Sequence, residues 1–234
     1  MYLEYILYPL TIAALVFSVW AQIKVSSTFK RLSNMPTACR RSAAEVARTI
    51  LDDAGLFGVR IERTRGSLTD HYDPRAGVLR LSDSVYSSFS PAAVGVAAHE
   101  AGHAIQHAVK YPPIVLRSKL VGATTFASRF AWITILLGSL LLMLDPLLGY
   151  YILLGGVALF SVIMIFQLVT LPCEFDASRR AMSLLERSGY YTRDELAASR
   201  EVLTAAALTY VASFTVTLTQ LLRFVFRLMN SRRR

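Results

Sequence analysis

The sequence is poor in cysteine and has long stretches without any charge. It contains only two cysteines, Cys39 and Cys173, in 234 residues. A disulfide framework needs several paired cysteines, so the class of small disulfide-stabilised secreted proteins is excluded and a reducing compartment is favoured. Hydrophobic residues make up 54% of the chain, and the mean hydropathy is +0.44. This composition is too apolar for an ordinary soluble domain.

The first charge-free stretch, residues 5–23, predicts a membrane anchor. At about 1.5 Å per residue, a helix of this length crosses a bilayer. A secretory signal peptide is the alternative. However, no basic segment precedes the stretch, it lacks a small-x-small cleavage site, and Lys24 follows it directly. We therefore expect a retained transmembrane anchor.

Three later stretches are also apolar. Residues 147–171 carry no charge, and residues 120–144 carry a single arginine. Asp145-Pro146 between them predicts a tight turn, so the two stretches are expected to form a transmembrane helical hairpin. Residues 203–222 are charge-free but rich in alanine and threonine. The sequence leaves open whether this last stretch spans the membrane or packs against protein.

Basic residues are concentrated in two segments. The net charge is +9, and 14 of the 25 lysines and arginines lie in residues 24–119, with five more in residues 173–201. The turn of the hairpin has none, which is the positive-inside pattern of a cytoplasmic-membrane protein with both basic segments in the cytoplasm. This distribution favours contact with the lipid bilayer over nucleic acid binding. If residues 203–222 cross the membrane, the basic residues 232–234 would lie outside the cytoplasm, which conflicts with the positive-inside pattern.

Capping residues and prolines predict four helices outside the apolar stretches. Each begins at a serine or threonine that can accept free backbone N–H groups, or just after a proline. The four expected helices are residues 43–54 after Ser42, residues 91–110 after Ser90, residues 174–188 after Pro172, and a long helix from Thr192 toward the C-terminus.

Alternating and turn patterns predict a small sheet after the first of these helices. Residues 59–63 alternate apolar and polar side chains, and a turn at residues 73–77 predicts a hairpin of residues 68–72 and 78–82. The expected fold class is α+β, mainly α, on a multi-pass transmembrane helix bundle. The expected segments are an anchor (1–23), a first catalytic part (24–119), a transmembrane hairpin (120–171), a second catalytic part (172–202), and an apolar helix with a basic tail (203–234).

The stretch VAAHEAGHAIQH, residues 96–107, contains an HExxH motif. His99 and His103 are four positions apart, so they lie on one helix face and both imidazoles can reach one metal ion. Glu100 can accept a proton from water at that ion. Zinc suits imidazole nitrogen, and a catalytic zinc site leaves one position open for water. Gly102 leaves room for close approach of backbone or substrate.

A third ligand is expected from the segment TLPCEFDASRRA, where Glu174 and Asp176 are both candidates. Two membrane crossings separate this segment from His99, so the chain has returned to the same side. The residues alone do not decide between the two carboxylates, since the dipole of a helix start also favours a solvated carboxylate. His107 is about 12 Å from His99 along the helix axis, too far to share the ion, and is expected in a supporting role.

Two other potential ligands are expected to have structural roles. His71 lies in the predicted hairpin, where a turn histidine is favoured over one that faces substrate. Cys173 is adjacent to Glu174, and adjacent side chains point in different directions on a regular backbone. We therefore do not expect Cys173 to share the ion.

Four ordered blocks of the sequence carry a more specific pattern. They are LTDHYDPRAGVLRLS, AAVGVAAHEAGHAIQHA, TLPCEFDASRRA and LTAAALTYVA. Together they resemble the bacterial membrane-bound neutral zinc metallopeptidases, the YugP-like family, over nearly the whole chain, and more distantly the HtpX-type membrane metalloproteases. The resemblance implies a zincin-like, gluzincin-type catalytic core with Zn²⁺ as cofactor and a peptide or protein as substrate.

The family pattern also implies roles for single residues. An aspartate four positions after the glutamate supports a zinc histidine in the HtpX-type pattern. Here Ser178 takes that position, so support is expected from another residue, such as Asp176. The strand of residues 78–82 would hold an extended substrate by β-pairing. The oxyanion also needs a donor besides zinc, for which Tyr210 and Arg179 are candidates. The implied zinc ligands are His99, His103 and Glu174, and the implied catalytic base is Glu100.

The sequence thus predicts a multi-pass zinc endopeptidase with its metal site on the cytoplasmic side. The alternative is a non-catalytic membrane scaffold with structural zinc, but structural sites usually close all four positions and favour cysteine. A metal transporter would place ionisable residues inside its spans, and residues 147–171 have none. No motif specifies the substrate sequence or the oligomeric state.

Overall fold

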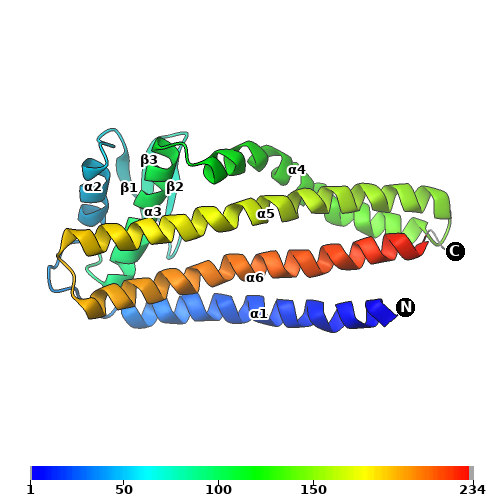
Figure 1. Cartoon of the computed structure of the whole chain (residues 1–234), viewed down its shortest axis with the longest axis horizontal. Helices are drawn as coiled ribbons and strands as arrows, with labels where there is room; N and C mark the ends of the chain where they lie inside the picture. Colours follow the sequence, from blue (N-terminus) through cyan, green and yellow to red (C-terminus); the bar gives the residue numbers. More distant parts are fainter. Residues whose placement is uncertain (1, 232–234) are drawn as a thin grey trace. The chain divides into compact units, whose positions relative to one another are not determined.

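The computed structural model describes residues 2–231, with side chains from residue 6 onward (Figure 1). The predicted basic tail, residues 232–234, lies outside the described residues. The class is α+β and mainly α, as predicted. In chain order the elements are α1 (Tyr2–Leu32), α2 (Ala43–Asp53), β1 (Arg60–Thr64), β2 (His71–Asp73), β3 (Val78–Ser82), α3 (Pro91–Ala108), α4 (Pro112–Leu141), α5 (Pro146–Ser188) and α6 (Arg193–Ser231).

The chain forms two compact units, each assembled from separated parts of the sequence. The first unit comprises Met1–Trp20, Leu116–Leu171 and Tyr210–Arg234, and the second comprises Ala21–Val115 and Pro172–Thr209. The four longest described helices, α1, α4, α5 and α6, contribute residues to both units. The sheet, α2 and α3 belong to the second unit.

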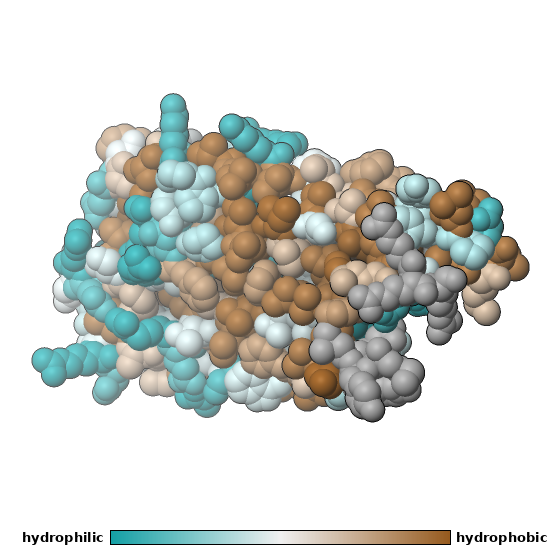
Figure 2. All heavy atoms as spheres, turned by 45° about the vertical axis from the view of Figure 1, so that its right-hand side comes forward, coloured by the Kyte–Doolittle hydropathy of each residue, from teal (hydrophilic) through white to brown (hydrophobic). Residues whose placement is uncertain are grey.

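Within the described residues, four helices are long and apolar enough to cross a membrane, namely α1, α4, α5 and α6. The undecided stretch of residues 203–222 lies within α6, so its length and composition suit a membrane span. Large apolar side chains such as Trp132, Ile133 and Leu136 on α4 are exposed. Figure 2 shows hydrophobic side chains over much of the visible face. Apolar surface of this extent fits contact with lipid.

Glycines bring α4 and α5 into close contact within the first unit. A Cβ added at Gly138 would lie 2.7 Å from Leu153 Cα, and one added at Gly156 would lie 3.0 Å from the backbone nitrogen of Ile135. Small residues commonly allow such close approach between membrane helices. The two helices are joined by the predicted turn, since α5 begins at Pro146.

Helix α5 continues through Pro172, so the prediction of a separate helix from residue 174 is wrong. Proline removes one backbone hydrogen bond, here the one that residue 172 would donate to Leu168. A long helix tolerates this loss when packing and neighbouring hydrogen bonds hold the adjacent turns. Thr170 and Cys173, on either side of the proline, are both buried. The apolar stretch and Glu174 therefore lie on one helix.

The three strands form a sheet in the order β1-β3-β2. β1 is parallel to β3, and β2 is antiparallel to β3 with Tyr72 opposite Leu79. The predicted hairpin pairing is confirmed, but its first strand covers residues 71–73 rather than 68–72. The prediction that β3 binds substrate by β-pairing is wrong, because both of its edges already pair with other strands. Leu79 and Leu81 are fully buried, as expected for a central strand. The edge next to α3 belongs to β2.

Helix α3 lies at the centre of the core of the second unit. Its small residues Ala97, Ala98 and Ala101 are fully buried, in one cluster with side chains from α2, β3, α5 and α6. The predicted start is confirmed, because the Ala93 N–H donates to Ser90 Oγ. The predicted capping boxes of α2 and α6 are also confirmed, at Ser42 with Glu45 and at Thr192 with Glu195.

Candidate metal site

Helix α3 presents two histidines from one face. His99 and His103 are one helical turn apart, and their ring centroids lie 4.7 Å from each other at an interplanar angle of 85°. His103 is 8% exposed, and His99 is half-buried. The four-residue spacing therefore brings the imidazoles together, as the sequence predicts.

Helix α5 places Glu174 against both histidines. Its Oε2 lies 3.3 Å from His99 Nε2 and 3.5 Å from His103 Nε2. The carboxylate is 2% exposed. Among the described residues, His99, His103 and Glu174 offer potential ligand atoms that all lie within 4.8 Å of one another. The structure thus brings the HExxH histidines together with Glu174 rather than with Asp176.

The two separations between Glu174 and the histidines suit zinc. In a tetrahedral site with ligands about 2.1 Å from the metal, ligand atoms lie about 3.4 Å apart. The observed 3.3 Å and 3.5 Å are close to this value. Two nitrogens and one carboxylate oxygen are ligands that zinc accepts, and three protein ligands leave a fourth position for water. These side chains could therefore hold a catalytic zinc ion.

Gly102 allows α3 to approach α5 at the level of the site. A Cβ at this position would lie 2.9 Å from the carbonyl oxygen of Ala177 and 3.4 Å from its Cα. Ala177 is one helical turn beyond Glu174, so this contact sets the spacing between the helices that supply the three side chains. The close approach expected at Gly102 is made by backbone.

Replacing Gly102 by alanine is expected to push α3 and α5 apart and destabilise the protein by about 1–3 kcal/mol. Zinc affinity should fall as well, because the movement separates Glu174 from both histidines. Thermal unfolding of the metal-free protein and zinc titration against a chelator measure the two effects. Gly122→Ala is the matched control, since a Cβ there meets no atom within 4 Å. Unchanged zinc affinity in Gly102→Ala would contradict the role of this contact.

The second nitrogen of each histidine also has a partner. His99 Nδ1 lies 3.1 Å from Ser178 Oγ, and His103 Nδ1 lies 2.9 Å from Gln106 Oε1. Support was expected from a residue other than Ser178, such as Asp176, but Ser178 itself contacts His99, and Asp176 accepts a hydrogen bond from Gln106 Nε2 at 2.9 Å. Gln106 was missed by the sequence reasoning. The feature that points to Gln106 in the sequence is a polar side chain within an alanine-rich helix that is expected to be buried.

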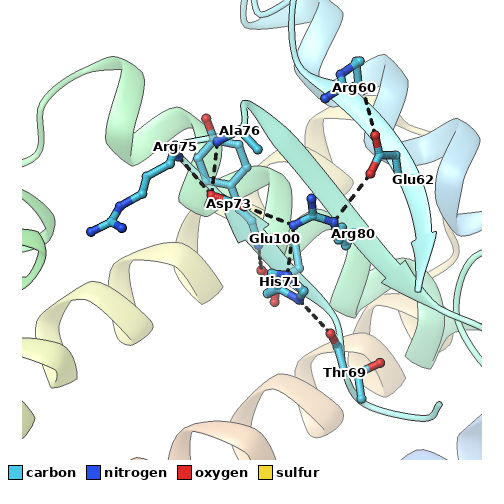
Figure 3. Close-up of polar contacts among 10 residues, drawn as sticks. Arg60, Glu62, Thr69, His71, Asp73, Arg75, Ala76, Arg80 and Glu100 are labelled. Atoms are coloured by element: carbon cyan, nitrogen blue, oxygen red, sulfur yellow. Dashed lines mark hydrogen bonds and ion pairs between the residues drawn. The ribbon is translucent and has the colours of Figure 1, made fainter. Parts of the chain in front are cut away.

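Glu100 faces the edge of the sheet. Its Oε2 accepts a hydrogen bond from the Tyr72 N–H of β2 at 3.0 Å (Figure 3). The carboxylate is half-buried and is not among the three converging ligand groups. Its negative charge acts on His103, so it lies near the converging group, and it also borders the edge of β2.

Arg80 on β3 is the centre of a charged cluster (Figure 3), on the face opposite Leu79 and Leu81, which pack in the core with α3. Arg80 on β3 lies 3.1 Å from Asp73 Oδ2, 3.5 Å from Glu62 Oε2 and 3.5 Å from His71 Nε2. His71 is the first residue of β2, so the expected turn position is wrong. Alternate residues of a strand point to opposite faces, which separates the His71 side chain from that of Tyr72.

The remaining candidates take other positions. The His107 ring packs against Tyr72 at a centroid distance of 5.7 Å. Cys173 is buried and is absent from the group of converging ligand atoms among the described residues. Arg179 is exposed on α5 in the second unit, whereas Tyr210 belongs to the first unit. The oxyanion roles of these last two residues remain predictions.

Burial and charge act in opposite directions on the pKa of His103. Burial disfavours the imidazolium and would lower the pKa. The hydrogen bond with Glu174 and the negative charges of Glu100 and Glu174 outweigh it, so the pKa is raised. Carboxylates that stabilise a proton on His103 would also stabilise a metal cation in its place.

Burial also raises the pKa of Asp70, although Ser82 donates two hydrogen bonds to it.

Known proteins resemble this chain over nearly its whole length. Residues 7–229 match the protein family described as "Putative neutral zinc metallopeptidase". The chain is 48% identical over 223 residues to a protein of Bacillus subtilis (strain 168) named "Putative membrane protease YugP", and the match covers 95% of this chain and 96% of that protein. No solved structure matches the chain.

Proposed function

The chain belongs to the family of neutral zinc metallopeptidases, and we propose that it is a membrane-embedded zinc endopeptidase. One observation carries the proposal. His99, His103 and Glu174 converge at separations suited to zinc, while the Glu100 carboxylate lies beside them without joining the group. A structural zinc site usually closes all four positions with protein ligands, whereas three ligand groups converge here among the described residues.

In the proposed mechanism, His99, His103 and Glu174 hold the metal, and Glu100 moves the proton. Bound there, zinc would polarise the substrate carbonyl and make water more acidic. Glu100 accepts a proton from the water that attacks the carbonyl carbon. It then passes this proton to the nitrogen of the leaving amine as the C–N bond breaks. Water is thereby divided between the new carboxyl and amino termini.

The edge of β2 supports an extended peptide as substrate. In an antiparallel pair, alternate residues turn their N–H and C=O groups away from the partner strand. Tyr72 is such a residue, because its N–H donates to Glu100 rather than to β3. A peptide pairing with this edge would have to take over the Tyr72 N–H from Glu100, which would free the Glu100 carboxylate beside the peptide backbone.

We further propose that the protein is a multi-pass protein of the bacterial cytoplasmic membrane, with its metal site on the cytoplasmic side. The concentration of 14 basic residues in residues 24–119 and five in residues 173–201 supports this orientation. Both segments lie mainly in the second unit, which contains the candidate site. Four described helices of spanning length and composition support several crossings.

The proposal is tested by zinc content and peptide cleavage of the purified full-length protein. We expect bound zinc, loss of cleavage when a chelator removes the metal, and recovery when zinc is restored. These results are expected if His99, His103 and Glu174 hold a zinc ion that the reaction requires. A protein that holds zinc firmly but cleaves no peptide would instead support the scaffold alternative.

A further inference from the structure

Gln106 bonds to both helices that supply the candidate metal ligands. Its side chain is fully buried on α3. Gln106 Oε1 lies 2.9 Å from His103 Nδ1, while its Nε2 donates to the Cys173 carbonyl oxygen at 2.8 Å and to Asp176 Oδ2 at 2.9 Å. Cys173 and Asp176 lie on either side of Glu174 in the sequence.

These partners fix the orientation of the Gln106 amide. The Cys173 carbonyl and an ionised Asp176 only accept hydrogen bonds, so they hold the amide nitrogen on their side. Arg180 Nε donates to the same Asp176 oxygen at 2.6 Å, which favours the ionised carboxylate. The amide oxygen must therefore face His103.

The orientation of the amide determines the tautomer of His103. Because the Gln106 oxygen is only an acceptor, His103 Nδ1 must carry a proton to bond with it. With that proton on Nδ1, a metal ion can bind the lone pair of Nε2. His103 Nε2 is the nitrogen that faces Glu174, at 3.5 Å.

The other histidine has no equivalent constraint. His99 Nδ1 faces the hydroxyl of Ser178 at 3.1 Å. A hydroxyl can donate or accept, so this contact is compatible with either tautomer of His99. Gln106 therefore fixes the tautomer of His103, whereas Ser178 does not fix the tautomer of His99.

We propose that Gln106 is a positioning residue that sets the tautomer of His103 and, through Cys173 and Asp176, the position of Glu174. One side chain would thus align two of the three metal ligands, although they come from different helices. This inference rests on the proposed zinc site. It assigns a role in metal binding to Gln106, a residue outside the HExxH motif.

Gln106→Met keeps much of the side-chain volume and removes all three hydrogen bonds. We expect zinc affinity to fall by about 10–100-fold, the range typical for losing a partner of a metal ligand. The visible absorption spectrum of the Co²⁺-substituted protein should also change, because the geometry at the metal changes. Zinc titration against a chelator and the Co²⁺ spectrum are both independent of proteolysis.

Ser199→Ala is the matched control. Ser199 is 2% exposed and donates to the carbonyl oxygen of Pro91 at 2.8 Å, so it also ties α3 to another helix in the core. The control should lower the thermal stability of the metal-free protein without changing zinc affinity or the Co²⁺ spectrum. A merely structural role for Gln106 predicts the same behaviour for Gln106→Met.

A second variant tests the nitrogen end of the Gln106 amide separately from the oxygen end. Gln106→Glu keeps an acceptor for His103 but turns a second acceptor toward Asp176 and the Cys173 carbonyl, so zinc affinity should fall. Wild-type zinc affinity in Gln106→Glu would overturn the link to Glu174.

The outcomes also distinguish this inference from the proposed function. If the wild-type protein binds zinc and Gln106→Met matches it in affinity and Co²⁺ spectrum, the inference fails and the proposed function stands. If the wild-type protein binds no zinc, both fail. Weakened zinc binding in Gln106→Met with an unchanged Ser199→Ala control supports the inference.

Discussion

Replacing Glu100 by glutamine is expected to leave zinc bound and to slow peptide hydrolysis by about 10²–10⁴-fold, the usual contribution of a general base. Glutamine has nearly the same shape but cannot take a proton from water. Its amide oxygen can still accept the hydrogen bond from the Tyr72 N–H, made at 3.0 Å in the wild-type protein. The edge strand should therefore keep its position. Zinc content and kcat/KM for a peptide substrate are the measurements.

Glu62→Gln is the control for the charge change. Glu62 is half-buried on β1 and bonds to Arg80 on the far face of the sheet, so hydrolysis should be unaffected. Wild-type rates in Glu100→Gln would rule out Glu100 as the base. Loss of zinc together with activity would show instead that Glu100 is a metal ligand.

Replacing Glu174 by alanine is expected to weaken zinc binding by more than about 100-fold. Losing a residue that hydrogen-bonds to a metal ligand typically lowers metal affinity about 10–100-fold, and losing the ligand itself should lower it further. The carboxylate is the single oxygen donor in the converging group and contacts both histidines, at 3.3 Å and 3.5 Å. Zinc titration against a chelator gives the affinity. When the zinc concentration is limiting, Glu174→Ala should no longer cleave peptides.

Glu186→Ala is the matched control on the same helix. Glu186 is exposed near the end of α5 and pairs with Arg200 at 2.7 Å. Surface ion pairs contribute about 0–1 kcal/mol, so stability and zinc affinity should barely change. If Glu174→Ala retains full zinc affinity, the third ligand must come from elsewhere, and Asp176→Ala would be the next variant to examine.

The sequence predicted those features that depend on local signals. The start of α3 at Ser90-Pro91 follows from a side chain capping nearby N–H groups. The meeting of His99 and His103 follows from helical periodicity alone. Glu174 could be preferred over Asp176 only through the family resemblance, because both carboxylates have suitable chemistry and lie two positions apart.

Features that depend on contacts between distant segments were not predicted. β3 is a central strand because β1 joins its second edge, and strand order is not encoded in the pattern of a single strand. Gln106 belongs to no short motif, and its importance is visible only when α5 places Cys173 and Asp176 against it. Proline favours a helix boundary at residue 172, but α5 continues through it.

The short length of β2 limits how much of a substrate can be bound through its backbone. The strand has three residues, so at about 3.4 Å per residue its edge extends for about 10 Å. Because alternate residues turn their backbone groups outward, a peptide pairing with it would bond mainly to Tyr72, through groups that every sequence shares. Short peptidomimetics carrying a zinc-binding group should therefore capture most of the affinity available at this edge. An edge this short also offers little template for strand-to-strand aggregation.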